Sequence, residues 1–231
     1  MRIAEIYASL QGEGLLAGTP SGFVRTSGCN LRCHWCDTPF TSWEPTGEEL
    51  STTDVLTQLV SFGHRHVVVT GGEPLLFPEV ADLCATLRRD GFHVTVETAG
   101  TVLPAAPADS IADLMSISPK LSSSAPPAET SGGWRERHEA ARRRDDVLRE
   151  LCRGPHQFKF VVESPADIEE LSRWLDDLGD LDRRRVFLMP QGCTPETLEA
   201  VGSWLEPACR RHGYRYAARH HIAWFGHTRG T

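Results

Sequence analysis

Short runs of apolar and β-branched residues alternate along this chain with longer stretches in which apolar residues recur at helical spacing. The short runs predict strands and the long stretches predict helices, because side chains repeat every two residues in a strand and every 3.6 in a helix. Strands are expected at residues 2–6, 22–26, 66–70, 93–97, 114–118, 158–162, 186–189 and 214–219. Helices are expected at residues 52–62, 78–89, 134–152, 165–178 and 195–212.

The alternation of strands and helices predicts an α/β fold with right-handed crossovers and a mainly parallel sheet, either open or curled toward a barrel. In such folds the chemistry lies at the carboxyl ends of the strands. A chain of 231 residues is expected to form a single domain. Residues 122–152 begin with a stretch rich in Ser, Pro and Gly and continue with many arginines, which indicates a loop and exposed helix inserted between strands.

The composition is that of a globular protein, with 40% apolar and 24% charged residues. A formal charge of −7 repels a phosphate backbone, so nucleic acid is not an expected partner. The chain shows neither a signal-peptide pattern nor a run near the roughly 18 apolar residues of a membrane span. We therefore expect a cytoplasmic protein without a membrane anchor.

Three of the seven cysteines are crowded into eight residues: Cys29, Cys33 and Cys36. This crowding favours metal binding over a disulfide framework. Iron–sulfur clusters normally take four thiolates, so three ligands on a cubane leave one iron open for a small molecule. A zinc site with His34 or a distant residue as the fourth ligand is the alternative, but zinc sites favour two Cys-x2-Cys pairs and no second pair exists here.

The spacing Cys-x3-Cys-x2-Cys, with the aromatic residue Trp35 before the last cysteine, resembles the signature of the radical S-adenosylmethionine (SAM) superfamily. A predicted buried strand runs into Gly71, Gly72 and Glu73, similar to the superfamily's glycine-rich element that receives the methionine end of SAM. The resemblance implies an incomplete TIM-like barrel of about six parallel strands with helices outside. It also implies a [4Fe–4S] cluster held by the three cysteines and SAM as cofactor.

Further polar residues follow other predicted strands and are expected around a common rim. Only Lys120 and Lys159 are lysines among 24 basic residues, so these two positions favour a compact ammonium over a guanidinium. Lys159 alternates with Phe158 and Phe160, which predicts that it points into the barrel. The resemblance implies that the following residues bind the cofactor: Trp35, Asp37, Gly72, Glu73, Ser118, Pro119, Lys120 and Gln191.

The whole chain resembles the 7-carboxy-7-deazaguanine synthase family in four segments. Residues 9–14 read Ser-Leu-Gln-Gly-Glu-Gly, where the family has a substrate-binding segment. Arg25 lies four residues before Cys29 and matches the arginine that pairs with the substrate carboxylate, for which a bidentate guanidinium is suited. Thr38 lies two residues after Cys36 and matches the magnesium-binding threonine. Residues 219–226 resemble the carboxyl-terminal segment that closes over the substrate.

This resemblance implies a carbon–nitrogen lyase of queuosine and 7-deazapurine biosynthesis. Its substrate would be 6-carboxy-5,6,7,8-tetrahydropterin, which undergoes radical ring contraction with loss of ammonia. The resemblance also implies Mg2+ at Thr38, a reducing electron donor such as flavodoxin or ferredoxin, and a homodimer. The implied substrate-binding residues are Leu10, Gln11, Gly12, Glu13, Arg25, Thr70, Arg219 and His221.

Two other readings of the sequence remain open. A glycyl-radical activating enzyme is another short radical SAM protein, but it gives no reason for Gln11, Arg25 and Thr38 at these spacings. A non-catalytic zinc- or cluster-binding protein that contacts RNA through its Arg142 region is an interpretation from a different class. Cofactor cleavage and the metal content of the purified protein separate these readings.

Overall fold

A computed structural model describes residues 1–179 and 181–231, and within these residues nine strands form one sheet. The strand order is β3-β1-β2-β4-β5-β6-β7-β8-β9. From β2 to β9 each neighbouring pair is parallel, whereas β1 is antiparallel to both β2 and β3. The strands are β1 Arg2–Leu10, β2 Pro20–Thr26, β3 Glu48–Glu49, β4 His66–Gly71, β5 His93–Thr98, β6 Leu114–Ile117, β7 His156–Val162, β8 Val186–Pro190 and β9 Arg215–Tyr216.

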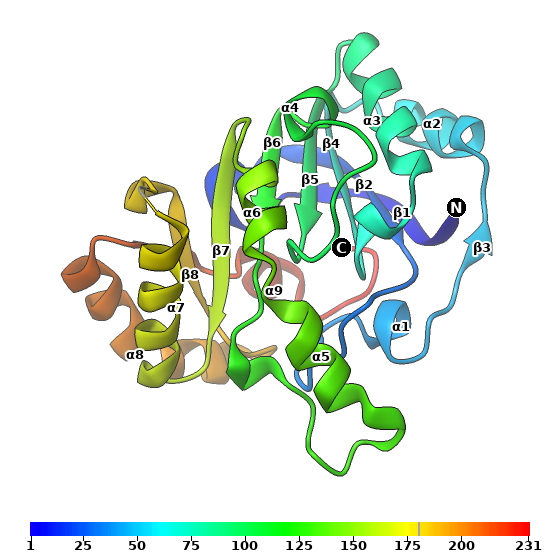
Figure 1. Ribbon diagram of the computed structural model, residues 1–231. Helices are drawn as coiled ribbons and strands as arrows, with labels where there is room; N and C mark the ends of the chain where they lie inside the picture. Colours follow the sequence, from blue (N-terminus) through cyan, green and yellow to red (C-terminus); the bar gives the residue numbers. More distant parts are fainter. Residues whose placement is uncertain (180) are drawn as a thin grey trace.

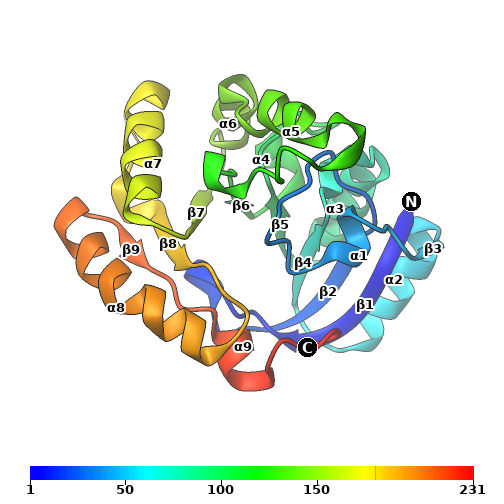
Figure 2. The same cartoon turned by 90° about the horizontal axis from the view of Figure 1, so that it is seen from below.

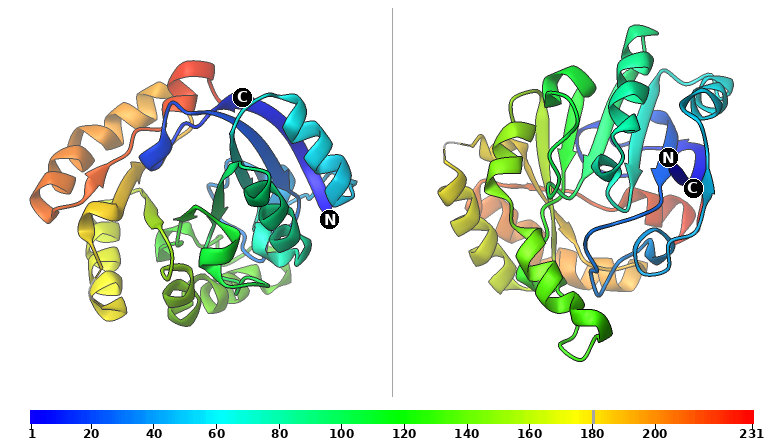
Figure 3. Two further views of the ribbon diagram at one scale, coloured as in Figure 1. Left: turned by 90° about the horizontal axis from the view of Figure 1, so that it is seen from above. Right: turned by 45° about the vertical axis from the view of Figure 1, so that its right-hand side comes forward.

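The sheet is strongly curved, with the long helices on its convex side (Figure 2). Seen from above, the strands form an open arc that does not close on itself (Figure 3). The α/β class and the incomplete TIM-like barrel are therefore confirmed, with seven parallel strands in the described part of the chain in place of about six. This curvature gives the sheet a concave face on which polar side chains from distant strands meet.

Local sequence signals define the ends of the long helices. Ser51, Ser164 and Thr194 form capping boxes at three of the N-termini, and proline follows immediately in the second and third. Together with five short 3-10 segments in the described chain, the helices are α1 Pro39–Ser42, α2 Thr52–Ser61, α3 Glu79–Arg89, α4 Ala108–Ile111, α5 Trp134–Arg142, α6 Asp145–Leu151, α7 Pro165–Leu178, α8 Pro195–His212 and α9 His220–Phe225. The predicted bounds of α7 and α8 are confirmed.

Two predicted elements are corrected by the structure. The helix expected over residues 134–152 is two helices, because Arg143 has an extended backbone and pairs with Asp145 and Asp177. The strand expected over residues 214–219 pairs only at Arg215–Tyr216, since the chain then turns to bring Arg219 toward the concave face. The two-residue strand β3 and the short helices α1, α4 and α9 were not predicted, because such short elements depend on tertiary contacts.

The hydrophobic core lies between the convex face of the sheet and its helices. Phe158 and Phe160 of β7 are buried there, and Phe160 packs edge-on against Trp174 of α7. Alternation along β7 then turns Lys159 to the concave face, as the sequence predicts. In the described residues we find no helix of the length and apolarity that crossing a membrane would take.

The segment inserted between β6 and β7 lies beside the cysteine loop, and its helix α5 lies at the lower edge of the molecule in Figure 1. The Arg32 backbone N–H donates to Nδ1 of His138, whose Nε2 lies 2.9 Å from the Ser124 hydroxyl. The Arg32 guanidinium also lies 4.0 Å from the centre of the Trp134 ring. The insertion therefore supports the loop that carries the three cysteines.

Candidate active site

A cavity of about 510 Å3 lies on the concave side of the sheet, at the carboxyl ends of the strands. All eight predicted substrate-binding residues line it, from β1, the loop after it, β2, β4 and the chain's last helix. The cavity also contains the three cysteines and most of the predicted cofactor and magnesium residues: Trp35, Asp37, Thr38, Gly72, Ser118 and Lys120. Segments nearly 200 residues apart in sequence thus meet in one site.

Three predicted cofactor residues are absent from the described lining of the cavity: Glu73, Pro119 and Gln191. Glu73 is fully buried and accepts hydrogen bonds from the Thr98 hydroxyl at 2.8 Å and the Ala99 backbone N–H at 2.8 Å. It therefore ties the glycine-rich element to the end of β5. The backbone N–H of Gln191 donates to Val162 and continues the pairing of β8 with β7.

The cysteine loop follows β2, and hydrogen bonds from its surroundings reach its sulfurs. The Leu31 backbone N–H donates to Sγ of Cys29 at 3.4 Å, and the Ser42 hydroxyl lies 3.3 Å from Sγ of Cys36. Burial raises the pKa of the Cys29 thiol to about 12 and that of Cys33 to about 11. Thiols this buried become thiolates when a metal takes the place of the proton.

The donor set fits a [4Fe–4S] cluster and SAM. In residues 1–179 and 181–231, no three His, Cys, Asp or Glu side chains converge closely enough to hold a single metal ion. A cubane instead takes each thiolate on a separate iron. The buried indole N–H of Trp35 has no hydrogen-bond partner in the described structure, which leaves a donor at the cofactor end of the cavity. A Cβ atom at Gly72 would overlap the Gly28 carbonyl and lie 2.8 Å from Cβ of Cys29, so only glycine fits beside the cysteine loop.

Two polar side chains of β1 hold the guanidinium of Arg25. Its Nε donates to Glu5 at 2.7 Å and one terminal nitrogen donates to the Tyr7 hydroxyl at 2.9 Å. The antiparallel register of β1 and β2 sets Glu5 directly opposite Arg25. Burial would lower the pKa of Arg25, but Tyr7 and Glu5 raise it, so the guanidinium stays charged in the cavity wall.

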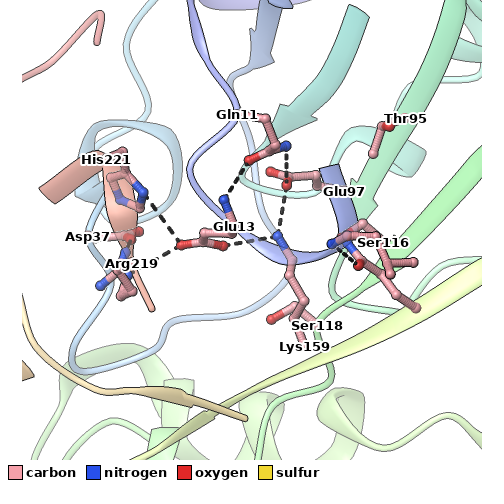
Figure 4. Close-up of polar contacts among 12 residues, drawn as sticks. Gln11, Glu13, Asp37, Thr95, Glu97, Ser116, Ser118, Lys159, Arg219 and His221 are labelled. Carbon is pink, nitrogen blue, oxygen red and sulfur yellow. Dashed lines mark hydrogen bonds and ion pairs between the residues drawn. The ribbon is translucent and has the colours of Figure 1, made fainter. Parts of the chain in front are cut away.

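A network of charged side chains lies in the same cavity (Figure 4). Nζ of Lys159 donates to Glu13 at 3.0 Å and to Glu97 at 2.8 Å. Gln11 lies between the two carboxylates: its amide donates to Glu97 at 3.4 Å, and its carbonyl oxygen accepts from the Glu13 backbone N–H at 3.1 Å. Lys159, which the sequence places inside the barrel, and Glu97 are thus neighbours of the predicted substrate residues Gln11 and Glu13.

Arg219 connects this network to the cysteine loop. Its guanidinium donates to Glu13 at 3.3 Å, to the Gly192 carbonyl at 2.7 Å and to the Asp37 carboxylate. Burial alone would raise the pKa of Asp37, but the charge of Arg219 lowers it. His221 lies 3.9 Å from Glu13 and close to the backbone of Gly12, where a Cβ atom would be 2.7 Å from Cβ of His221.

The segment 227–231, which follows the predicted substrate-closing segment 219–226, also lines the cavity. Arg229 donates to Glu5 at 2.9 Å and to the Ala4 carbonyl at 2.8 Å, and it stacks on Phe40. His227 contacts the backbone carbonyl of Asp37 at 3.1 Å. Sequence reasoning missed this segment and both Glu5 and Tyr7. The two β1 residues share one face of that strand, and this period-two pattern was the available signal.

The model of the Radical SAM superfamily matches residues 23–125. A 7-carboxy-7-deazaguanine synthase of Rhodopirellula baltica is 44% identical over 231 residues, covering 99% of this chain and 88% of that protein. The chain belongs to the 7-carboxy-7-deazaguanine synthase family. A synthase of Halobacterium salinarum is 46% identical, covering 96% of this chain and 89% of that protein. The crystal structure of QueE from Escherichia coli has a TM-score of 0.68 and 26% identity, covering 94% of this chain and 92% of that one.

Membership of this synthase family over the full length favours it over the two other readings of the sequence, a glycyl-radical activating enzyme and a zinc- or RNA-binding protein. It implies a [4Fe–4S] cluster and SAM at the site described above.

Proposed function

We propose that the chain converts 6-carboxy-5,6,7,8-tetrahydropterin into 7-carboxy-7-deazaguanine with release of ammonia, in queuosine or 7-deazapurine biosynthesis. The observation that carries this proposal is one cavity lined both by Cys29, Cys33 and Cys36 and by Arg25 and the Gln11–Glu13 segment. A radical generator and a carboxylate-recognition group in one cavity suit a small carboxylated substrate.

The cofactor end of the cavity would be formed by the cysteine loop, Gly72, Ser118 and Lys120. When bound, the reduced cluster and SAM supply a 5′-deoxyadenosyl radical, which is the hydrogen-abstracting species of the superfamily. Lys120 donates to Ser118 at 2.7 Å and lies 5.9 Å from the centre of the Trp35 ring. These three side chains give a cation, a hydroxyl and an aromatic face for a sulfonium nucleoside.

The substrate end would be formed by Arg25 and the segment after β1. Glu5 and Tyr7 hold the Arg25 guanidinium in place, so its remaining N–H groups can donate to the substrate carboxylate. Gln11, Glu13 and Thr70 would contact the pterin ring. His221 in the first turn of α9 and Arg219, which directly precedes that helix, would cover the ring and exclude water from the reacting carbon.

Further parts of the proposal concern partners. Mg2+ would bind at Thr38, whose hydroxyl accepts a hydrogen bond from Thr41 at 3.3 Å, and would take its other ligands from substrate and water. A reduced flavodoxin or ferredoxin would supply the electron, and the chain would act as a homodimer. Its seven free cysteines fit a reducing compartment such as the cytoplasm.

The test is anaerobic incubation of the reconstituted protein with reductant, SAM and 6-carboxytetrahydropterin. We expect 7-carboxy-7-deazaguanine and ammonia, and no product with a Cys33→Ala control. Tetrahydropterin without the carboxylate is the matched substrate control, and we expect it to react far more slowly because it leaves Arg25 unpaired. Formation of 5′-deoxyadenosine without any deazaguanine product would overturn the proposal.

A further inference from the structure

Lys159 lies in the middle of β7, and its ammonium points into the cavity from the concave face of the sheet. The side chain is 3% exposed. Lysine is almost never buried to this extent unless its charge is paired. Cofactor binding does not explain why a lysine is buried here, because the cofactor end of the cavity lies around the other lysine, Lys120.

The partners of Lys159 are two carboxylates that reach it from different parts of the fold (Figure 4). Glu13 follows β1, and Glu97 lies near the end of β5. Both carboxylates line the same cavity as Lys159. One ammonium, at 3.0 Å from Glu13 and 2.8 Å from Glu97, therefore fixes the separation and direction of both groups.

The two carboxylates differ in how much they depend on Lys159. Glu13 also has Arg219 at 3.3 Å and His221 at 3.9 Å. In the described part of the chain, Lys159 is the one cation within ion-pair distance of Glu97. Several charged or titratable groups interact electrostatically with Glu13 or Glu97: Lys159, Arg219, His221, Asp37, Tyr7 and His66.

The charges are mutually stabilising. Burial alone would raise the pKa of Glu13, but Lys159 and Arg219 hold it well below its usual range. Burial would likewise lower the pKa of Lys159, but Glu97 and Glu13 raise it. Without the ammonium, both carboxylates would lose the donor that they share, and Glu97 would lose the one cation within ion-pair distance of it in the described residues.

A tetrahydropterin offers several N–H donors: the 2-amino group and N3–H on one edge and N5–H and N8–H of the reduced ring on another. An ionised carboxylate is an acceptor only and can accept two parallel N–H bonds, whereas a protonated one has become a donor on one oxygen. Recognition of such edges therefore needs carboxylates that are both charged and fixed in direction.

We propose that Lys159 is a positioning residue that holds Glu13 and Glu97 as a pair of fixed carboxylate acceptors for the N–H edges of the bound pterin. This inference rests on the proposed function. It assigns the recognition of the heterocycle to Glu97 as well as Glu13, and it gives Lys159 an indirect role through both. Recognition of the substrate carboxylate is assigned to a different group, the Arg25 guanidinium held by Glu5 and Tyr7.

The experiment measures binding without turnover. Protein reconstituted with cluster and SAM, without reductant, is titrated anaerobically with 6-carboxy-5,6,7,8-tetrahydropterin by calorimetry at pH 7. Lys159→Met should bind this ligand roughly tenfold or more weakly than the wild type, because both carboxylates lose the donor that fixes their direction. Lys159→Arg, which keeps the charge, should recover part of the affinity. Arg184→Met, which removes an exposed cation paired with Asp182 outside the cavity, should bind as the wild type does.

A second variant separates positioning from general damage. In the double variant Lys159→Met/Glu97→Gln the two losses of affinity should not multiply, since Lys159 acts through Glu97. Losses that multiply would instead mean that Lys159 contacts the pterin directly or only stabilises the fold, and either overturns the proposal. Should Lys159→Met not fold, Glu97→Gln alone decides: affinity within twofold of wild type would exclude Glu97 from recognition. Failure of the wild-type protein to bind 6-carboxy-5,6,7,8-tetrahydropterin would contradict the proposed function itself.

Discussion

Arg219 pairs with Asp37 across 182 positions of sequence. Asp37 directly follows the last cysteine of the loop, and Arg219 directly precedes the chain's last helix. Because the same guanidinium reaches Glu13 and the Gly192 carbonyl, one side chain joins the cysteine loop, the substrate segment and the end of the chain. The contact between these three segments, which covers the cavity, therefore depends on the planar guanidinium of Arg219 and its several N–H donors.

Replacing Arg219 with lysine should lower kcat/KM by roughly tenfold or more, because an ammonium cannot reproduce the directed donors of the guanidinium. Steady-state kinetics under anaerobic conditions measure the change. Arg210→Lys is the matched control, since Arg210 is exposed on α8 and pairs with Glu206 at 2.8 Å. Equal kinetics in the two variants would show that Arg219 has no part in closure.

Arg25→Lys should weaken binding of 6-carboxypterin by roughly tenfold while changing the affinity for pterin, which lacks the carboxylate, much less. The reason is that Glu5 and Tyr7 position a guanidinium fork, and lysine offers a single point charge. Comparing dissociation constants for the two ligands in each protein isolates the carboxylate contact. A similar loss of affinity for both ligands would argue that Arg25 supports the cavity wall and does not bind the substrate carboxylate.

Ser42→Ala should lower the reduction potential of the cluster by an amount on the order of tens of millivolts. The buried Ser42 hydroxyl lies 3.3 Å from Sγ of Cys36 and must donate when that sulfur is a thiolate, which stabilises the more electron-rich reduced cluster. A redox titration followed by electron paramagnetic resonance gives the potential. Ser61→Ala, on the exposed surface of α2, is the control, and an unchanged potential in Ser42→Ala would contradict the assignment.

Thr38→Ala should abolish the stimulation of the reaction by Mg2+ if the ion binds at this hydroxyl. The expected result is a reduced rate that no longer responds to added Mg2+, because one of the few protein ligands has been lost. Initial rates over a Mg2+ titration measure it. Unchanged rate and unchanged magnesium response would remove Thr38 from the site.

The stability of the protein should fall as pH decreases from about 6.5 to 4, in part because of His66. Its ring is buried between the hydroxyls of Ser21 at 2.7 Å and Thr95 at 2.8 Å. Burial, with His93 nearby, lowers its pKa to about 4. The unfolded chain therefore binds more protons in this window, and the free energy of unfolding falls as pH falls.

In His66→Gln, that slope should be shallower by up to about 1.4 kcal/mol per pH unit, the effect of one proton. Urea unfolding of the anaerobic protein at several pH values gives the slope. The variant is also expected to be less stable at pH 7, so the slope and not the absolute stability is the diagnostic quantity. Identical slopes in both proteins would show that His66 does not contribute.

The sequence by itself determined the parts of this protein that depend on local spacing. The capping signals and proline positions fixed the bounds of α7 and α8, since helix ends are satisfied by residues three or four positions away. The crowding of Cys29, Cys33 and Cys36 identified the cluster loop in the same way. The prediction of one helix over residues 134–152 failed at Arg143, where the backbone is extended and the side chain pairs with Asp177 of α7. That partner lies on another helix, so no local pattern indicates it.

Only the tertiary structure decided which side chains act together. Glu5 lies opposite Arg25 through strand register, and Lys159 meets Glu13 and Glu97 through the curvature of the whole sheet. Alternation along β7 predicts that Lys159 points inward, but not what it meets there. The physical reason is that a buried charge takes its partners from whichever strands the curved sheet brings within about 3 Å, and no local pattern encodes that distance.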